Sequence, residues 1–278
     1  MYMNNKDNEK IKIYNADFRD ITKDLPDDSI DLILTDPPYL TNFKCQINFK
    51  YRLSTHKHER IYKDSFKSKE GRDLINDFFC ECKRLLKKDG LLLFFINDKR
   101  LLYFMQMAFN NGLWQNYFIT WVKNNIHMNQ YHTQVNKRAE YILGYRKERL
   151  EKISYNPNME LYDVINFDNI DGSLKNHPNE KPQNILLHFL QLFNYKNDKI
   201  FKVLDPFMGG GSLGKACKTF NYVINDNIEY IGIEKEEQFF NNAKELIFSN
   251  NRIYELQRQQ KVNAGQNNKN NLLKYLGG

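Results

Sequence analysis

Four residues that can do chemistry follow a short apolar segment, 31–35, near the start of the chain: Asp36, Pro37, Pro38 and Tyr39. A strand cannot continue through two residues without an N–H group, so the chain must leave the sheet here. The turn presents a carboxylate, stiff backbone carbonyls and an aromatic ring at the carboxyl end of the strand, where open α/β sheets bind ligands. The alternative is a strand followed by a proline turn with an incidental tyrosine.

A glycine-rich loop forms a second candidate site. The apolar segment 200–205 ends at Asp205 and is followed by Pro206-Phe207-Met208-Gly209-Gly210-Gly211-Ser212-Leu213-Gly214. Glycines between a strand and a helix let the backbone approach a ligand closely and present helix N–H groups to it. A further strand, 230–233, ends at Glu234. An acid at such a strand end can bind the two hydroxyls of a ribose.

The glycine loop, with the Lys215 that follows it, matches most of a phosphate-binding P-loop. That motif requires Ser or Thr after the lysine to hold magnesium, and this chain has Ala216. Asp205 would also repel phosphates. A neutral or cationic nucleoside fits better, because Asp205 can face an ammonium group while Glu234 holds the ribose. S-adenosylmethionine is such a ligand.

Strands and helices that alternate along the chain must position these residues, and the pattern predicts a parallel α/β sheet. Strand 11–14 runs into Asp17, so we expect Asp17 and Asp36 to face one crevice. The strands are expected at 11–14, 31–35, 91–96, 117–122, 140–145, 200–205 and 230–233. The helices are expected at 74–86, with Gly90 as its stop, and at 99–111, 184–193 and 237–248, besides one after the glycine loop.

Two segments outside this pattern have a composition suited to a polyanion or a specific substrate. Segment 40–69 interleaves basic residues with aromatics, which can neutralise phosphates and stack on unpaired bases; a solvated insertion is the alternative. The formal net charge of +7 also favours a polyanionic partner. Segment 146–174 is weakly patterned, and an insert of this size in an enzyme often chooses the substrate.

The remaining composition excludes several classes of protein. The polar N-terminus lacks the apolar core of a signal peptide, and the longest apolar run, 91–96, is too short to span a bilayer. We therefore expect a soluble, cytoplasmic protein with no membrane contact. The four cysteines form no C-x-x-C pair, so reduced thiols and no metal are expected. Residues 251–278 are predicted to be a polar basic tail.

Together the motifs resemble the beta class of amino-group DNA methyltransferases, over most of residues 10–248. The Asp-Pro-Pro-Tyr motif precedes the glycine-rich motif, which is similar to D-P-F-x-G-S-G-T, and His177-Pro178-Asn179-Glu180-Lys181-Pro182 resembles H-P-T-Q-K-P. The resemblance implies a circularly permuted Rossmann-like α/β fold that depends on S-adenosylmethionine, with a mostly parallel sheet and helices on both faces. It implies one domain, 1–250, with a catalytic half (10–145), a target-recognition insert (146–174) and a cofactor half (175–250).

The resemblance also implies a role for individual residues. Asp36 and the Pro37 carbonyl would accept the hydrogens of an exocyclic amine, with Pro38 stiffening the turn and Tyr39 stacking on a flipped base. The residues implied to surround the methionine part of S-adenosylmethionine are Asp205, Phe207, Gly209 and Gly211, and Ser212 is a further residue expected to bind the cofactor. Glu234 would hold its ribose, Asp17 and Phe18 its adenine, and His177 and Lys181 its carboxylate. The chain departs from the family pattern at Ala16, Glu180, Gly210 and Ser212.

The expected substrate is adenine N6 in double-stranded DNA, because cytosine N4 enzymes of this class usually have serine at the position of Asp36. The basic loop 40–69 would help to clamp the DNA. Cytosine N4 methylation, RNA adenosine methylation and a nucleic-acid-binding protein without turnover stay open as alternatives. Protein glutamine methyltransferases place the glycine loop first, unlike this chain. A cognate restriction enzyme and a homodimer are further partners that the resemblance allows.

Overall fold

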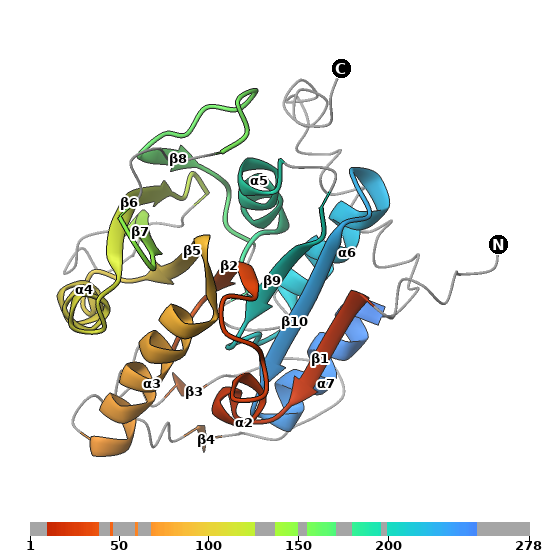
Figure 1. Cartoon of the computed structure of the whole chain (residues 1–278). Helices are drawn as coiled ribbons and strands as arrows, with labels where there is room; N and C mark the ends of the chain where they lie inside the picture. The colour runs from red at the N-terminus through yellow and green to blue at the C-terminus, as the bar shows by residue number, and fades with distance from the viewer. Residues whose placement is uncertain are drawn as a thin grey trace.

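The computed structural model describes residues 10–38, 45–46, 59–60, 68–125, 137–149, 155–170, 180–195 and 199–248. In this part of the chain, helices cover both faces of one eight-stranded sheet (Figure 1). The strands of that sheet are β1 (Ile11–Asn15), β2 (Ile30–Thr35), β5 (Leu86–Ile96), β6 (Trp114–Val122), β7 (Ala139–Arg146), β8 (Val164–Asn166), β9 (Phe201–Asp205) and β10 (Ile228–Glu234). The helices are α2 (Phe18–Thr22), α3 (Lys69–Leu85), α4 (Leu101–Asn110), α5 (Gln183–Phe193), α6 (Ser212–Val223) and α7 (Glu237–Phe248).

The strand order explains where a ligand can bind. It is β1-β10-β9-β2-β5-β7-β6-β8. From β9 the chain continues through α6 to β10 on one side, whereas from β2 it continues through α3 to β5 on the other. The neighbouring parallel strands β2 and β9 therefore flank a topological switch point. A crevice forms outside the carboxyl ends of such strands, and Asp36 and Asp205 lie at these two ends.

The strand β7 runs against its neighbours. It pairs antiparallel with β5 and with β6, whereas β1, β10, β9, β2 and β5 pair in parallel. The sheet is therefore mostly parallel, as predicted. A separate antiparallel pair, β3 (Cys45–Gln46) with β4 (Glu59–Arg60), lies inside the predicted basic loop, most of which is outside the described residues.

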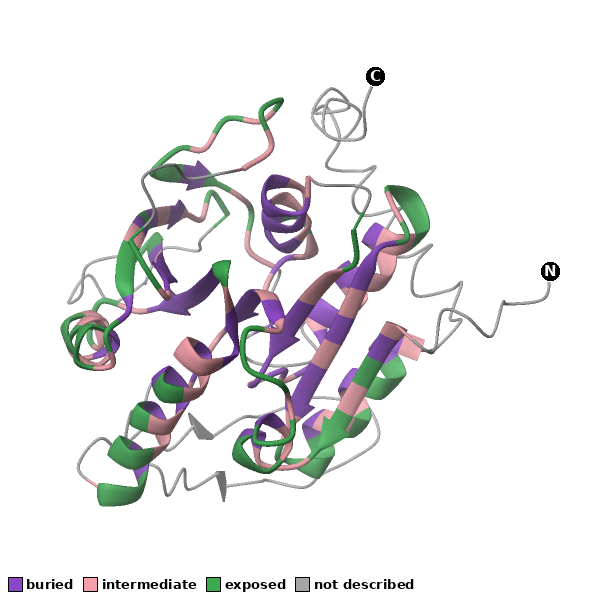
Figure 2. Cartoon of the chain, in the orientation of Figure 1, coloured by how far each residue is buried: buried purple, intermediate pink, exposed green. Residues whose placement is uncertain are grey.

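Buried side chains form one core on each face of the sheet, since successive residues of a strand point to opposite faces. In β2, Leu32 and Leu34 pack in the cluster beneath α5, α6 and α7, whereas Ile33 packs in the cluster with α2, α3 and α4. The central strands are buried along most of their length, and the helices expose their outer sides (Figure 2). Burial on both faces is why 91–96 carries no polar residue.

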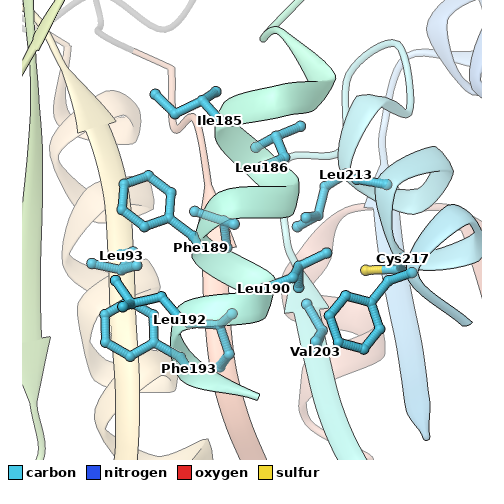
Figure 3. Close-up of a cluster of buried hydrophobic side chains, with 14 of the residues drawn as sticks. Leu93, Ile185, Leu186, Phe189, Leu190, Leu192, Phe193, Val203, Leu213 and Cys217 are labelled. Atoms are coloured by element: carbon cyan, nitrogen blue, oxygen red, sulfur yellow. The ribbon is translucent and has the colours of Figure 1, made fainter. Parts of the chain in front are cut away.

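Helix α5 packs closely against the sheet. Most of its apolar residues are buried, namely Ile185, Leu186, Phe189, Leu190, Leu192 and Phe193, and several of them lie beside Leu93 of β5 and Val203 of β9 (Figure 3). Leu213 and Cys217 of α6 extend the same cluster. This packing fixes the segment just before α5, which contains Glu180 and Lys181, over the carboxyl edge of the sheet.

The structure moves several of the predicted boundaries. Helix α3 begins at Lys69, before the predicted 74, and ends at Leu85, because Leu86 already pairs with Ile30 as the first residue of β5. Gly90 lies inside β5, where an added Cβ would be 2.8 Å from the Ile30 carbonyl oxygen, so a close backbone approach requires the glycine. The predicted insert contains the three-residue strand β8, and its first residue, Arg146, belongs to β7.

None of the helices in the described ranges is both long enough and apolar enough to cross a membrane.

Candidate active site at the sheet switch point

Asp36 and Lys181 form a shielded ion pair at the carboxyl end of β2. The Asp36 Oδ2 and Lys181 Nζ atoms are 3.0 Å apart, and the two side chains are only 14% and 11% exposed. Pro37 is buried and Pro38 is half-buried, so the two prolines hold the chain rigidly as it leaves the strand. Tyr39 lies outside the described residues. The site thus contains the carboxylate that the sequence predicted, with a cation beside it.

Asp205, at the end of the adjacent strand β9, is a buried carboxylate. The Thr35 hydroxyl donates a hydrogen bond of 2.7 Å to Asp205 Oδ1, and the Phe207 amide donates one of 3.2 Å to the same oxygen. Burial raises the pKa of Asp205 to about 7, and the carboxylates of Asp36 and Glu234 add to the rise. A bound cation would relieve this cost, which suits Asp205 to an ammonium group.

The glycine loop follows Asp205 and leads into α6. Gly209 and Gly211 have φ angles of 54° and 84°, in the left-handed region that favours glycine. At Gly211 an added Cβ would also lie 2.8 Å from the Cβ of Ala243. The loop is held to the sheet by a hydrogen bond of 2.8 Å from the Met208 amide to the Ile233 carbonyl. The loop conformation therefore depends on these two glycines.

Glu234, predicted to bind a ribose, also braces the glycine loop. Its Oε2 atom accepts a hydrogen bond of 2.9 Å from the Gly209 amide, and its Oε1 atom accepts one of 2.8 Å from the Glu236 amide. Glu234 thereby links the end of β10 to the loop after β9.

Asp17 and Phe18 lie further along the same edge of the sheet. Two strands, β10 and β9, separate β1 from β2, so the expectation that Asp17 and Asp36 face one crevice is wrong. Asp17 caps α2 and accepts hydrogen bonds from Arg19, which lower its pKa to about 2. The buried ring of Phe18 packs edge-on against Phe207, with the centroids 5.2 Å apart. Phe207 therefore connects the two parts of this edge.

A pocket opens at the switch point. Asp36, Lys181 and Asp205 contribute its charged lining, together with Glu180, which is only 4% exposed. The rest of the lining comes from the end of β2, from β5, from α5 and from the glycine loop: Leu34, Thr35, Phe95, Leu186, Phe207, Met208, Gly209, Gly210, Ser212 and Leu213. Asp17, Phe18, Gly211 and Glu234 do not line it, and His177 lies outside the described residues.

Lys181, which the sequence predicts to lie near a cofactor carboxylate, has two acidic neighbours within the protein. Its Nζ atom contacts Asp36 and lies 2.5 Å from Glu140 Oε1. Glu140 in turn pairs with Lys123 at 2.7 Å. Sequence reasoning missed Glu140 and Lys123. The available signal was a charged residue, Glu140, next to the largely apolar run 141–145 of the same strand.

Comparisons with known proteins assign the chain to a family. The model of the DNA methylase family N6_N4_Mtase matches residues 30–245. The chain therefore belongs to the N6/N4 DNA methylase family, which confirms the predicted resemblance.

Two curated relatives illustrate the similarity. The Type II methyltransferase M.HinfI of Haemophilus influenzae is 28% identical over 257 residues, which cover 81% of this chain and 65% of that protein. The Type II methyltransferase M2.MboI of Moraxella bovis is 27% identical over 252 residues, which cover 86% of this chain and 88% of that protein. The chain thus spans just under two thirds of M.HinfI, but most of M2.MboI.

Solved structures show the same fold. The complex of M1.HpyAVI with S-adenosylmethionine has a TM-score of 0.61 and 24% identity, covering 86% of this chain and all of that one (100%). The cytosine-N4-specific PvuII DNA methyltransferase has a TM-score of 0.61 and 15% identity, covering 91% of both chains. The predicted Rossmann-like methyltransferase fold is confirmed.

Proposed function

We propose that this DNA methylase transfers a methyl group from S-adenosylmethionine to the N6 amino group of adenine in double-stranded DNA. The observation that carries the proposal is the shielded Asp36 carboxylate at the end of β2, beside a buried Asp205 at the end of β9. One carboxylate can orient an amine, and the other can attract the cationic donor. Their neighbouring strands bring the two reactants to one crevice.

The pocket fits S-adenosylmethionine chemically. Buried Asp205 suits the ammonium group, and the apolar lining of Phe207, Met208 and Leu213 suits the sulfonium-bearing chain. S-adenosylmethionine, when bound, supplies an electrophilic methyl group. Its presence in the M1.HpyAVI complex supports the same cofactor here. We assign the remaining contacts as predicted: Glu234 to the ribose, and Asp17 and Phe18 to the adenine.

The mechanism that we propose is direct transfer without a covalent enzyme intermediate. The lone pair of an exocyclic amine is delocalised into the base, so the amine is a poor nucleophile. Asp36 and the Pro37 carbonyl accept hydrogen bonds from its two N–H groups and favour a tetrahedral nitrogen. As this nitrogen bonds to the methyl group, the methyl–sulfur bond would break, S-adenosylhomocysteine would leave, and the amine would lose one proton to solvent. Because the target is stacked in a duplex, the base must first flip out, and Tyr39 is the residue proposed to stack on it.

Several features support DNA adenine as the substrate. Asp36 stands at the position where cytosine N4 enzymes of this class usually have serine. The net charge of +7 and the basic segment 40–69 suit a polyanion. The curated relatives are named Type II methyltransferases, so a cognate restriction enzyme is part of the proposal. We further propose that segment 146–174 selects the target sequence.

The test is to identify the methylated nucleoside. The protein is incubated with labelled S-adenosylmethionine and either duplex DNA or RNA, and the nucleic acid is digested to nucleosides. We expect label in N6-methyldeoxyadenosine. Label in N4-methyldeoxycytidine, label only in RNA, or no label in either nucleic acid would each overturn the proposal.

Variants of β2 connect the activity to Asp36. Asp36→Asn keeps the shape of the side chain but removes the charge, and we expect it to abolish transfer while cofactor binding persists. The matched control is Asp31→Asn, because Asp31 lies on the same strand and pairs with Lys87 at 2.7 Å, remote from the pocket. Normal transfer by Asp36→Asn would contradict the mechanism.

A further inference from the structure

A row of alternating charges extends from Asp36 to the far side of β5. Lys181 Nζ lies between Asp36 Oδ2, at 3.0 Å, and Glu140 Oε1, at 2.5 Å. Glu140 Oε2 lies 2.7 Å from Lys123 Nζ. The side chains are 11–18% exposed, so solvent screens these contacts weakly. Two carboxylates and two ammonium groups balance one another.

This row connects strands that do not touch. Asp36 follows β2 and Glu140 belongs to β7, and β5 lies between these strands in the sheet. Lys181 comes from the segment before α5 and passes over β5, where its Nζ atom lies 4.8 Å from the centroid of the Phe95 ring. Phe95 is buried, so the Lys181 ammonium group makes a cation–π contact with a buried ring and lies between the carboxylates of Asp36 and Glu140.

Glu140 is itself held from a second direction. Lys123 follows β6, its amide donates to the Arg138 carbonyl at 2.9 Å, and its Nζ atom lies 4.7 Å from the Trp121 ring centroid. Burial alone would raise the pKa of Glu140, but Lys181 and Lys123 lower it, so Glu140 stays ionised. Burial likewise opposes the charge of Lys181, but Asp36 and Glu140 raise its pKa above the ordinary value. Lys181 is therefore a fixed cation, unsuited to serve as a base.

We propose that Lys181 and Glu140 are positioning residues for methyl transfer: Glu140 fixes Lys181, and Lys181 holds the Asp36 carboxylate ionised and oriented toward the target amine. This inference rests on the proposed function, and it gives Lys181 a different role from binding the cofactor carboxylate. Its physical basis is that a neighbouring cation lowers the pKa of a carboxyl group by about 1–3 units.

The experiment compares Lys181→Gln, Lys181→Arg and Glu140→Gln with the wild-type protein in two assays. The first is the pH profile of kcat at saturating DNA and cofactor, with the Kd of S-adenosylmethionine measured in parallel. Among the described residues, the titratable groups besides Asp36 that lie around Lys181 and Glu140 or line the pocket are Lys123, Glu140, Asp205 and Glu180. The second is the titration of the Asp36 carboxyl carbon by NMR, assigned from the spectrum of Asp36→Asn.

We expect Lys181→Gln to lower kcat roughly 10- to 100-fold and to move the acidic limb of its pH profile upward by about 1–3 units, at unchanged Kd for S-adenosylmethionine. Lys181→Arg keeps the charge, so it should keep the limb in place and recover part of kcat. Glu140→Gln should lower kcat about tenfold without raising the limb, because it removes a negative neighbour. The control Asp31→Asn should leave kcat and its pH profile unchanged.

Three results would overturn the inference. One is a weakened affinity for S-adenosylmethionine in Lys181→Gln at unchanged kcat, which would place Lys181 on the cofactor. A second is a wild-type kcat and pH profile in both Lys181→Gln and Glu140→Gln. If the wild-type protein transfers no methyl group, the proposed function fails. The NMR titration still decides whether Lys181 lowers the pKa of Asp36, and an unchanged titration in Lys181→Gln would also reject the inference.

Discussion

The hydroxyl of Thr35 donates a hydrogen bond of 2.7 Å to the Asp205 carboxylate, although 170 positions separate the two residues in the sequence. Both are buried, and they are the last residues of the neighbouring strands β2 and β9. The contact therefore joins the two halves of the chain at the switch point of the sheet.

Removal of this hydroxyl should lower both the unfolding free energy and the affinity for S-adenosylmethionine. Thr35→Val keeps the shape of the side chain but leaves the buried carboxylate short of a donor, which costs roughly 1–3 kcal/mol of unfolding free energy. Thr35→Ser keeps the donor and serves as the control. Denaturant unfolding and calorimetric binding of S-adenosylmethionine check both effects. Equal stability and affinity of the valine and serine variants would contradict the assigned role.

Cofactor binding should strengthen as the pH rises through 7. Burial raises the pKa of Asp205 from 3.8 to about 7, so the unfolded chain loses this proton at a lower pH than the folded protein. The unliganded fold is therefore destabilised increasingly between about pH 4 and 7. A bound ammonium group offsets this cost only when Asp205 is ionised. We expect a larger rise in Tm with S-adenosylmethionine at pH 8 than at pH 6.

Two controls isolate Asp205 in that measurement. Asp205→Asn has no carboxyl group to titrate, so its rise in Tm should not depend on pH in this range. Methylthioadenosine lacks the ammonium group and should stabilise the wild-type protein equally at both pH values. A pH dependence that persists in Asp205→Asn would assign the effect to another group.

A side chain at Gly211 should destabilise the protein more than one at Gly210. Gly211→Ala places a Cβ at a φ of 84° and 2.8 Å from the Cβ of Ala243, so both strain and a clash result. The left-handed conformation alone costs about 1–2 kcal/mol. Gly210→Ser is the control, because the resembling family usually has serine there. Thermal unfolding should show a lower Tm for Gly211→Ala alone; a comparable loss in both variants would refute this account.

The sequence predicted the scaffold and the position of the site better than the contacts within it. Hydrophobic periodicity was sufficient for the long helices and central strands, and the two motifs placed Asp36 and Asp205 at strand ends. The three-residue strand β8 is too short to form a pattern, and the apolar segment that became β7 does not reveal its direction. The pairing of Asp36 with Lys181 depends on how the segment before α5 crosses β5, which residue spacing does not encode.

Segment 155–170, part of the insert that we propose selects the target sequence, provides the last prediction. Ile165 is buried, Trp121 Nε1 donates to the Phe167 carbonyl at 2.8 Å, and β8 pairs with β6, so deletion of the segment would damage the fold. Tyr162, in contrast, is 58% exposed. The segment contains Glu160, Asp163 and Asp168 but no lysine or arginine, which suits contacts with base edges more than with phosphates.

We therefore expect Tyr162→Ala to change the preferred target sequence at an unchanged Tm. Ile165→Ala should lower the unfolding free energy by roughly 2–5 kcal/mol without changing that preference. Both variants are incubated with a duplex library of random sequence, and the positions of the methylated bases are read by sequencing. If Tyr162→Ala methylates the same sequences in the same proportions as the wild-type protein, Tyr162 takes no part in target selection, and the recognition residues must lie elsewhere in the chain.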